Sequence, residues 1–265
     1  MSLSQNQLQD FQKILEPTGK KYIFVTVSGA HLYGFDSVDS DLDLRGCHWP
    51  DVDESLKYQD SKDTFEVFLE PSQYFAEESD IVSHQVLKYM YLMAKQPNGY
   101  ILEQLLSPLV VQTSEAHQEL IQIGQMMISK EMRFHYGGFY RNQRKLFIGR
   151  NNKEIKYTLY QARILCTAVC LAKTGQLQPN LMLANEVAGL FSQEKVKELI
   201  QLKIKGENLN FVDESLKNYW FEELAKQEAE MESVFELSSL PNFNRALIQS
   251  EITKFIHRHL QLGWS

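Results

Sequence analysis

The most constraining feature of the chain is a tight turn followed by a pair of carboxylates. Residues 22–27 are β-branched or aromatic and predict a strand ending at Ser28-Gly29, and Asp41 and Asp43 follow in a second run with alternating apolar residues. In an extended chain, residues two apart share one face, so both carboxylates point the same way. Like charges this close repel unless a cation lies between them, and Mg²⁺ takes oxygen ligands while leaving room for phosphates. The pattern therefore indicates a site for phosphoryl or nucleotidyl transfer.

The same acidic run also matches the opening of a calcium-binding EF-hand loop. Asp39, Asp41 and Asp43 occupy the first, third and fifth positions of such a loop. The match fails at the sixth position, where Leu44 replaces a glycine, and at the twelfth, where Pro50 replaces the bidentate glutamate. The sequence therefore favours a phosphate-handling metal site over a calcium loop.

Composition and charge limit the class of protein. With 43% hydrophobic and 23% charged residues, the 265-residue chain has the content of a folded protein of one or two domains. Apolar stretches such as residues 86–94 are too short to cross a bilayer, and the N-terminal residues lack the basic start and apolar core of a secretory signal. Three cysteines are too few for a disulfide framework. We therefore expect a cytoplasmic protein without a membrane partner.

The net charge of −7 hides two blocks of opposite sign. Residues 36–80 contain fourteen acidic and three basic residues, whereas residues 131–156 contain seven basic and two acidic ones. A negative block that holds metal and a positive block that holds phosphate would suit an enzyme that uses a metal-bound nucleotide. Two solvated faces of opposite sign explain the same counts equally well, so charge alone leaves both interpretations open.

The patterns predict an α+β protein in which strands give way to helices along the chain. The expected strands are residues 22–27, 41–47, 65–69 and 81–83. The expected helices are residues 5–15, 84–95, 100–106, 116–130, 133–147, 156–173, 194–205, 213–237 and 243–260. Gly175 is expected to end the helix over residues 156–173. Asn242 is the predicted N-cap of the last helix. We expect a mixed α/β domain in residues 1–111 and a helical domain in residues 112–265.

Three separated stretches of the chain resemble a known family. Residues 28–35 with 39–46 resemble the predicted nucleotidyltransferases of the DNA polymerase beta superfamily, and more narrowly the RNA-repair, ligase-associated RlaP-like group. Residues 80–108 are similar to a second signature region of that group, and residues 156–175 to a third. The resemblance implies a five-stranded or similar mixed sheet with flanking helices, and transfer of a nucleoside monophosphate from a nucleoside triphosphate.

The resemblance also implies roles for individual residues around the turn. By position, Asp41, Asp43 and Asp80 would be the metal ligands and catalytic carboxylates for Mg²⁺ or Mn²⁺. Gly29 would let backbone N–H groups approach the β- and γ-phosphates because it has no side chain, and Ser28 would supply a hydroxyl.

A second set of residues would bind the nucleotide from the helical part. Lys156 and Arg163 are seven residues apart, so on a helix they point to about the same side. Together with the family resemblance, this spacing makes both candidates for contacts to the triphosphate. His31 and His84 are weaker candidates, because a lone histidine is more often structural.

Two departures from the family pattern leave a second function open. Ala30 stands where the family has a serine, and the third carboxylate is ambiguous because Gln85 occupies a position where some relatives have Asp and Glu66 is a rival. The leading interpretation is a two-metal nucleotidyltransferase whose acceptor the sequence does not identify: RNA, a protein and a small molecule all stay open. The alternative is a weak or inactive nucleotide- or RNA-binding module of the same fold in an RNA-repair or toxin–antitoxin system. A metal-dependent phosphohydrolase would need a water-positioning base that the sequence does not identify.

Overall fold

The structure is a computed structural model of the chain, and it describes all residues except 1–4, 51–62, 71–77, 150–153, 207–208 and 260–265. Two compact units form within it. Unit 1 comprises residues 1–29, 41–127 and 243–265, and unit 2 comprises residues 30–40 and 128–242.

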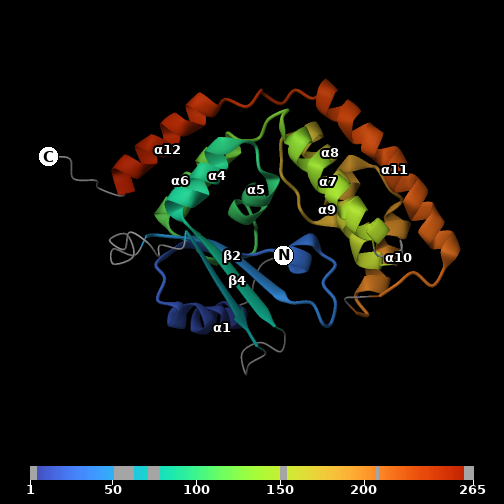
Figure 1. Cartoon of the computed structure of the whole chain (residues 1–265), viewed down its shortest axis with the longest axis horizontal. Helices are drawn as coiled ribbons and strands as arrows, with labels where there is room; N and C mark the ends of the chain where they lie inside the picture. Colours follow the sequence, from blue (N-terminus) through green and yellow to red (C-terminus); the bar gives the residue numbers. More distant parts are fainter. Residues whose placement is uncertain (1–4, 51–62, 71–77, 150–153, 207–208, 260–265) are drawn as a thin grey trace. The chain divides into compact units, whose positions relative to one another are not determined.

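Unit 1 is built on a mixed β-sheet (Figure 1). In the described residues this sheet has five strands in the order β3-β4-β2-β1-β5. The strands are β1 (Tyr22–Val27), β2 (Leu42–His48), β3 (Thr64–Leu69), β4 (Ser79–Gln85) and β5 (Val110–Gln112). β2 and β4 are parallel, and the other neighbouring pairs are antiparallel. The expected mixed sheet is therefore confirmed, with β5 as a strand that the sequence did not predict.

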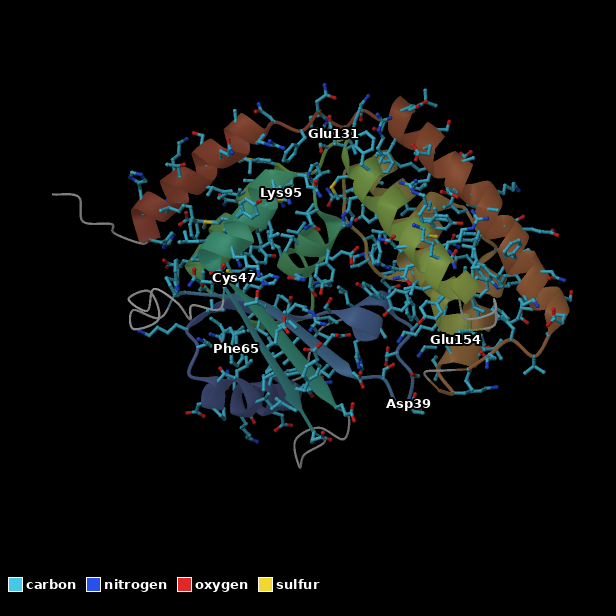
Figure 2. The ribbon with its side chains drawn as sticks, in the orientation of Figure 1. Asp39, Cys47, Phe65, Lys95, Glu131 and Glu154 are labelled. Atoms are coloured by element: carbon cyan, nitrogen blue, oxygen red, sulfur yellow. The ribbon has the colours of Figure 1, made fainter. Side chains whose placement is uncertain are left out.

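The central strands of the sheet are buried on both faces. Every residue of β1 is buried, as expected for a run of β-branched and aromatic residues without polar alternation. The helices α4 (Val86–Lys95) and α5 (Gly99–Leu105) pack on β2, and α1 (Gln5–Leu15), followed by the short 3₁₀ helix η1 (Glu16–Thr18), packs beside β5. Cys47 of β2 is completely buried in this core (Figure 2).

Two helices from beyond residue 111 complete unit 1. α6 (Glu115–Gln125) packs on α5 and β1, and α12 (Arg245–His259) packs on α4 and α6. Because α12 returns to the sheet unit, the division into 1–111 and 112–265 that the sequence suggested does not coincide with the two compact units. Asn244, and not Asn242 as predicted, caps α12, since its side chain accepts a hydrogen bond from the backbone N–H of Leu247 at 3.0 Å.

Unit 2 is helical and is organised around one buried helix. Its helices are α7 (Met132–Gly149), α8 (Ile155–Thr174), α9 (Leu181–Ala188), α10 (Gln193–Lys203) and α11 (Glu214–Leu237). α8 packs against the other four, and nearly all of its residues from Leu159 to Ala172 are buried, as expected for a helix that is apolar on most sides. It ends where Gly175 adopts a left-handed conformation with φ 69°, as the sequence predicted.

Residues 30–40, which link the Ser-Gly turn to the acidic run, also belong to unit 2. The short helix α2 (Gly29–Tyr33) leads into this segment. The rings of Tyr33 and Phe35 both contact Tyr160 of α8, and the buried Lys203 of α10 donates a hydrogen bond to the Ser37 hydroxyl at 2.8 Å. The segment is thus held by the helices of unit 2, while the residues before and after it belong to the sheet unit.

None of the helices in the described part of the chain is long and apolar enough to pass through a membrane.

Candidate functional site

Asp43 and Asp80 are brought together by the parallel pairing of β2 with β4. In this register Asp43 lies opposite Asp80, and Leu44 lies opposite Ile81. Leu44 and Ile81 are completely buried, whereas the side chains of Asp43 and Asp80 retain 27% and 22% of their exposure. Since neighbouring strands lie about 4.8 Å apart, the register places two carboxylates side by side on one face of the sheet.

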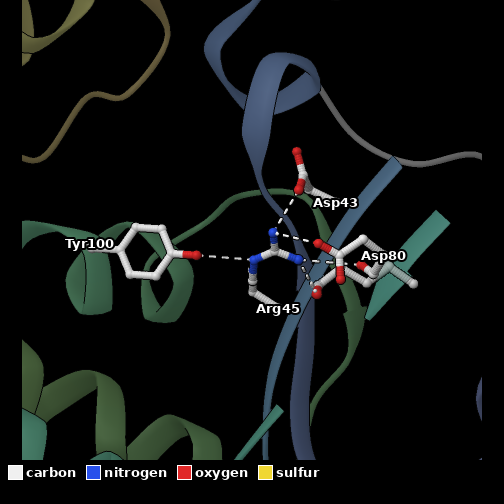
Figure 3. A network of polar contacts seen from close by, with 5 residues as sticks. Asp43, Arg45, Asp80 and Tyr100 are labelled. Atoms are coloured by element: carbon white, nitrogen blue, oxygen red, sulfur yellow. Dashed lines mark hydrogen bonds and ion pairs between the residues drawn. The ribbon is translucent and has the colours of Figure 1, made fainter. Parts of the chain in front are cut away.

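The guanidinium of Arg45 lies between these two carboxylates (Figure 3). Its Nη2 donates to Oδ1 of Asp43 at 2.6 Å and to Oδ2 of Asp80 at 3.1 Å. Arg45 follows Asp43 by two residues on β2, so both side chains project from the same face of the strand. One positive charge therefore offsets the repulsion between two neighbouring negative ones.

Arg45 is itself held firmly from the other side. Its Nε donates to the Tyr100 hydroxyl at 3.1 Å, and its Nη1 donates to the backbone carbonyls of Leu44 and Asp80 at 2.9 and 3.3 Å. Burial alone would lower the pKa of Arg45, but interactions with Tyr100, Asp43 and Asp80 outweigh it, so the pKa is raised. The guanidinium is therefore positively charged at neutral pH.

One carboxylate oxygen of the pair lacks a partner. Oδ1 of Asp80 is buried and has no hydrogen-bond partner among the described residues. A buried acceptor that nothing binds costs free energy, and such an oxygen suits a cation or a donor supplied by a ligand.

The Ser28-Gly29 turn lies directly against Asp43. The backbone N–H of Ser28 donates to the carbonyl of Asp43 at 2.8 Å, and Gly29 has a left-handed φ of 61°. A Cβ on Gly29 would lie 1.7 Å from Oδ2 of Asp43, so any side chain there would clash with the carboxylate. The glycine is thus explained by the space that Asp43 needs. The expected roles of Ser28 and Gly29 in phosphate binding stay predictions.

Asp41, the remaining expected metal ligand, lies just outside the strand pair that aligns Asp43 with Asp80. Asp41 is exposed and precedes β2, which begins at Leu42. The described residues contain no group of three or more His, Cys, Asp and Glu side chains arranged to hold a metal ion. In this structure, β2 and β4 pair Asp43 with Asp80, and β2 begins one residue after Asp41.

A family profile decides the classification of the chain. The profile described as RlaP, RNA repair pathway DNA polymerase beta family, matches residues 3–250. The chain belongs to this family. Because the match spans the turn, both paired carboxylates and α8, the family assignment covers the whole of the candidate site.

Two relatives are identical to this RlaP-family chain at about a quarter of the aligned positions. The uncharacterized protein MJ0002 of Methanocaldococcus jannaschii is 28% identical over 204 residues, covering 76% of this chain and 80% of that protein. The uncharacterized protein YcgL of Bacillus subtilis is 25% identical over 213 residues, covering 78% and 79%. A crystal structure of a nucleotidyltransferase-like protein from Exiguobacterium sibiricum aligns with 99% of this chain and 81% of that chain at 10% identity and a TM-score of 0.33.

The nucleotide contacts expected from α8 are only partly compatible with the structure. Lys156 is partly exposed near the start of the helix, and its contact with a triphosphate stays a prediction. Arg163 is completely buried, with its guanidinium 4.0 Å from the ring centroid of Tyr33 and 5.4 Å from that of Phe139. Its cation–π contact with Tyr33 anchors the 30–40 segment, so this structure does not support a direct contact of Arg163 with a nucleotide.

The basic block that suggested phosphate binding is partly neutralised within unit 2. Arg141 and Arg144 of α7 lie 4.0 and 3.4 Å from the carboxylate of Glu228 on α11, and Arg133 lies 4.0 Å from that of Glu236. Arg150 and Lys153 lie outside the described residues. The ion pairs favour the interpretation of this block as one charged face of a helix packed against another.

The two weaker histidine candidates have structural surroundings. His31 Nδ1 lies 3.7 Å from the Asp36 carboxylate within the 30–40 segment. His84 on β4 hydrogen-bonds the Thr64 hydroxyl at 2.9 Å, and burial together with the charges of Lys88 and Arg45 lowers its pKa to about 4. His84 is therefore neutral at pH 7.

Sequence reasoning missed two residues of the site. Arg45 carried a usable signal, because its spacing of two from Asp43 on a predicted strand puts it on the carboxylate face. Tyr100 carried none, since its contact with Arg45 joins positions 55 residues apart and depends on how α5 packs on the sheet.

Proposed function

We propose that this protein is a metal-dependent nucleotidyltransferase that moves a nucleoside monophosphate from a nucleoside triphosphate to an acceptor hydroxyl. The observation that carries the proposal is the pairing of Asp43 with Asp80 on two parallel strands, beside the Gly29 turn, in a chain of the RNA repair pathway DNA polymerase beta family. Adjacent carboxylates next to a turn without a side chain are what a metal–triphosphate substrate requires.

The donor set fits a divalent cation such as Mg²⁺ or Mn²⁺. Asp43 and Asp80 would hold the ion, and the buried Oδ1 of Asp80, which has no hydrogen-bond partner among the described residues, is an oxygen ready for a cation. Asp41 would add a third carboxylate from the start of β2. When bound, the ion supplies charge neutralisation for the phosphates and acidifies the attacking hydroxyl.

The reaction itself asks the protein mainly to position its substrates. The acceptor oxygen forms a bond to the α-phosphorus, the bond from that phosphorus to the bridging oxygen breaks, pyrophosphate leaves, and the hydroxyl proton passes to solvent water. Gly29 keeps the space beside Asp43 clear of any side chain, and the Ser28 and Gly29 backbone would bind the departing phosphates. A contact of Lys156 with the triphosphate stays a prediction from the sequence.

RNA is the acceptor that we propose first, on the basis of the RNA repair pathway in the family description. A protein hydroxyl is the second acceptor class. The transfer assay should therefore offer single-stranded RNA, nicked RNA and the protein itself with each of the four α-labelled nucleoside triphosphates, in Mg²⁺ or Mn²⁺.

The matched variants are Asp43→Asn, Asp80→Asn and, as a control, Asp39→Asn. Each exchange removes one charge at constant size, and Asp39 is an exposed turn residue. Label transfer by the wild type and the control, lost in both site variants, supports the proposal. Transfer that survives in Asp43→Asn and Asp80→Asn contradicts it.

A nucleotide- or RNA-binding module without transfer is the second candidate function. The observation that favours it is that Arg45 already binds an oxygen of each carboxylate, while the described residues contain no group of three or more His, Cys, Asp and Glu side chains arranged to hold a metal ion. Saturable binding of a labelled nucleoside triphosphate or RNA, with no transfer to any acceptor in either metal, would establish this function instead.

A further inference from the structure

The guanidinium of Arg45 uses its full hydrogen-bonding capacity within the site. An arginine side chain has five N–H donors in a rigid planar fork. The structure gives them five acceptors, which are the Tyr100 hydroxyl, the carbonyl oxygens of Leu44 and Asp80, Oδ1 of Asp43 and Oδ2 of Asp80. With only 9% of its surface exposed, Arg45 has no donor left over for a substrate phosphate.

Arg45 binds one oxygen of each carboxylate and leaves the other oxygen of each pointing elsewhere. At Asp80 the second oxygen, Oδ1, is buried and has no hydrogen-bond partner among the described residues. At Asp43 the second oxygen, Oδ2, faces Gly29, whose missing side chain leaves room for it. The orientation of both carboxylate planes is therefore set from one side by the same guanidinium (Figure 3).

The anchor behind Arg45 makes this orientation rigid. Tyr100 lies on α5, and α5 is tied to the sheet by the Thr26 hydroxyl, which donates to the carbonyl of Gln104 at 2.8 Å, and to α4 by the Tyr89 hydroxyl, which donates to the carbonyl of Ile101 at 2.9 Å. The bonds to the Leu44 and Asp80 carbonyls fix the guanidinium relative to both strands. A planar fork held at three points transmits a defined geometry to the two carboxylates that it binds.

We propose that Arg45 is a positioning residue for a divalent cation: it holds Oδ1 of Asp43 and Oδ2 of Asp80 so that Oδ1 of Asp80 is presented to the ion. This inference rests on the proposed function for the existence of the cation site, and it adds how that site is preformed. Partners that orient metal-binding side chains tune the affinity for the ion, and their loss typically weakens metal binding roughly 10–100-fold.

The opposite role makes the opposite prediction. If the guanidinium takes the place of the cation, Arg45 competes with metal, and its removal tightens metal binding. The two roles predict opposite changes in the Kd for Mn²⁺. A titration in which electron paramagnetic resonance measures the free Mn²⁺ distinguishes them and does not depend on catalysis.

The titration compares the wild type with Arg45→Met, Arg45→Lys and Tyr100→Phe. For a positioning role, the Kd for Mn²⁺ rises about 10–100-fold in Arg45→Met. It rises less in Arg45→Lys, which keeps the charge but loses the fork, and a few-fold in Tyr100→Phe, which loosens Arg45 without touching either carboxylate. The number of bound ions per chain stays that of the wild type, a result that partial unfolding would not give.

Lys254→Met is the charge control, because it breaks the 2.7 Å ion pair with Glu251 on α12 within the same unit and should leave the Kd unchanged. Should Arg45→Met fail to fold, Arg45→Lys and Tyr100→Phe still decide the matter. An unchanged or lower Kd in the variants, or a wild type that binds no Mn²⁺, overturns the inference. A wild type that binds Mn²⁺ with a Kd that rises in the Arg45 variants, but transfers no label, contradicts only the proposed function.

Discussion

Asp43 and Asp80 lie directly opposite each other where β2 runs parallel to β4. A parallel register puts opposite residues on the same face, so the fold pairs these carboxylates although they are far apart in the sequence. Arg45 binds both, at 2.6 and 3.1 Å. Charge balance in the site therefore depends on all three side chains at once, and we expect each one to contribute to stability.

Asp43→Asn should lower the free energy of unfolding by about 1–3 kcal/mol. The exchange keeps the size of the side chain but removes the closest ionic partner of a guanidinium that is 9% exposed. Urea denaturation of the wild type and variant at pH 7 measures the difference. Asp39→Asn, on the exposed turn, should stay within about 0.5 kcal/mol of the wild type. Equal effects of the two substitutions would contradict the ion-pair argument.

Gly29→Ala should abolish label transfer and destabilise the protein, because the new Cβ would lie 1.7 Å from Oδ2 of Asp43. Gly19→Ala is a matched control: Gly19 has a similar φ of 65°, but a Cβ there would have nothing within 4 Å. Both variants share the cost of a left-handed alanine, about 1 kcal/mol, so the extra loss in Gly29→Ala reports the clash alone. Thermal unfolding curves that coincide for the two variants would show that Asp43 moves aside freely.

Much of the sheet could be predicted because its signals are local. The continuous β-branched and aromatic run of β1 and the alternation in β2 indicated buried strands, and the structure confirms both within one residue. The α8 helix and its end at Gly175 followed from apolar content and a glycine stop. The assignment of Asp80 came from family resemblance, and the structure then placed it opposite Asp43.

The rest depended on contacts between distant parts of the chain. The strand β5 has three residues, which is too short for a recognisable pattern of alternating apolar and polar residues. No local sequence pattern indicates that α12 packs on α4 and α6 of unit 1. The burial of Arg163 was partly readable, because its neighbours on α8 are apolar on almost every side. Whether Asp41 belongs to β2 depends on where the strand begins, and sequence patterns define strand ends only to within a few residues.

The protein should lose stability as the pH falls from about 6.5 to 4, partly through His135 on α7. Burial, with the nearby charge of Arg163, lowers the pKa of His135 from 6.5 to about 4. Between these values the unfolded chain takes up a proton that the folded protein does not, so the free energy of unfolding falls through this window and levels off below it. Since one pKa unit corresponds to about 1.4 kcal/mol, partial exposure leaves a contribution on the order of 1–2 kcal/mol.

His135→Phe should reduce the fall in the free energy of unfolding between about pH 6.5 and 4, because phenylalanine does not titrate. Phenylalanine also fits a site that is already lined by the rings of Tyr136 and Phe139. Urea titrations at several pH values between 4 and 7 give the slope for each protein. His84 titrates in the same window, so the slope in His135→Phe is reduced but not zero. An unchanged slope would show that His135 is protonated as readily in the folded protein as in the unfolded chain.

Asp41→Asn separates a functional from a structural role for the acidic run. Asp41 is exposed and precedes β2, so its exchange should change the free energy of unfolding by less than about 0.5 kcal/mol. If Asp41 completes the metal site when substrate binds, label transfer should nevertheless fall at least about 100-fold, since metal ligands contribute several kcal/mol to phosphoryl transfer. Asp43→Asn should lose both stability and transfer, which makes it the matched comparison. Wild-type transfer in Asp41→Asn would remove Asp41 from the site and leave Asp43 and Asp80 as its acidic residues.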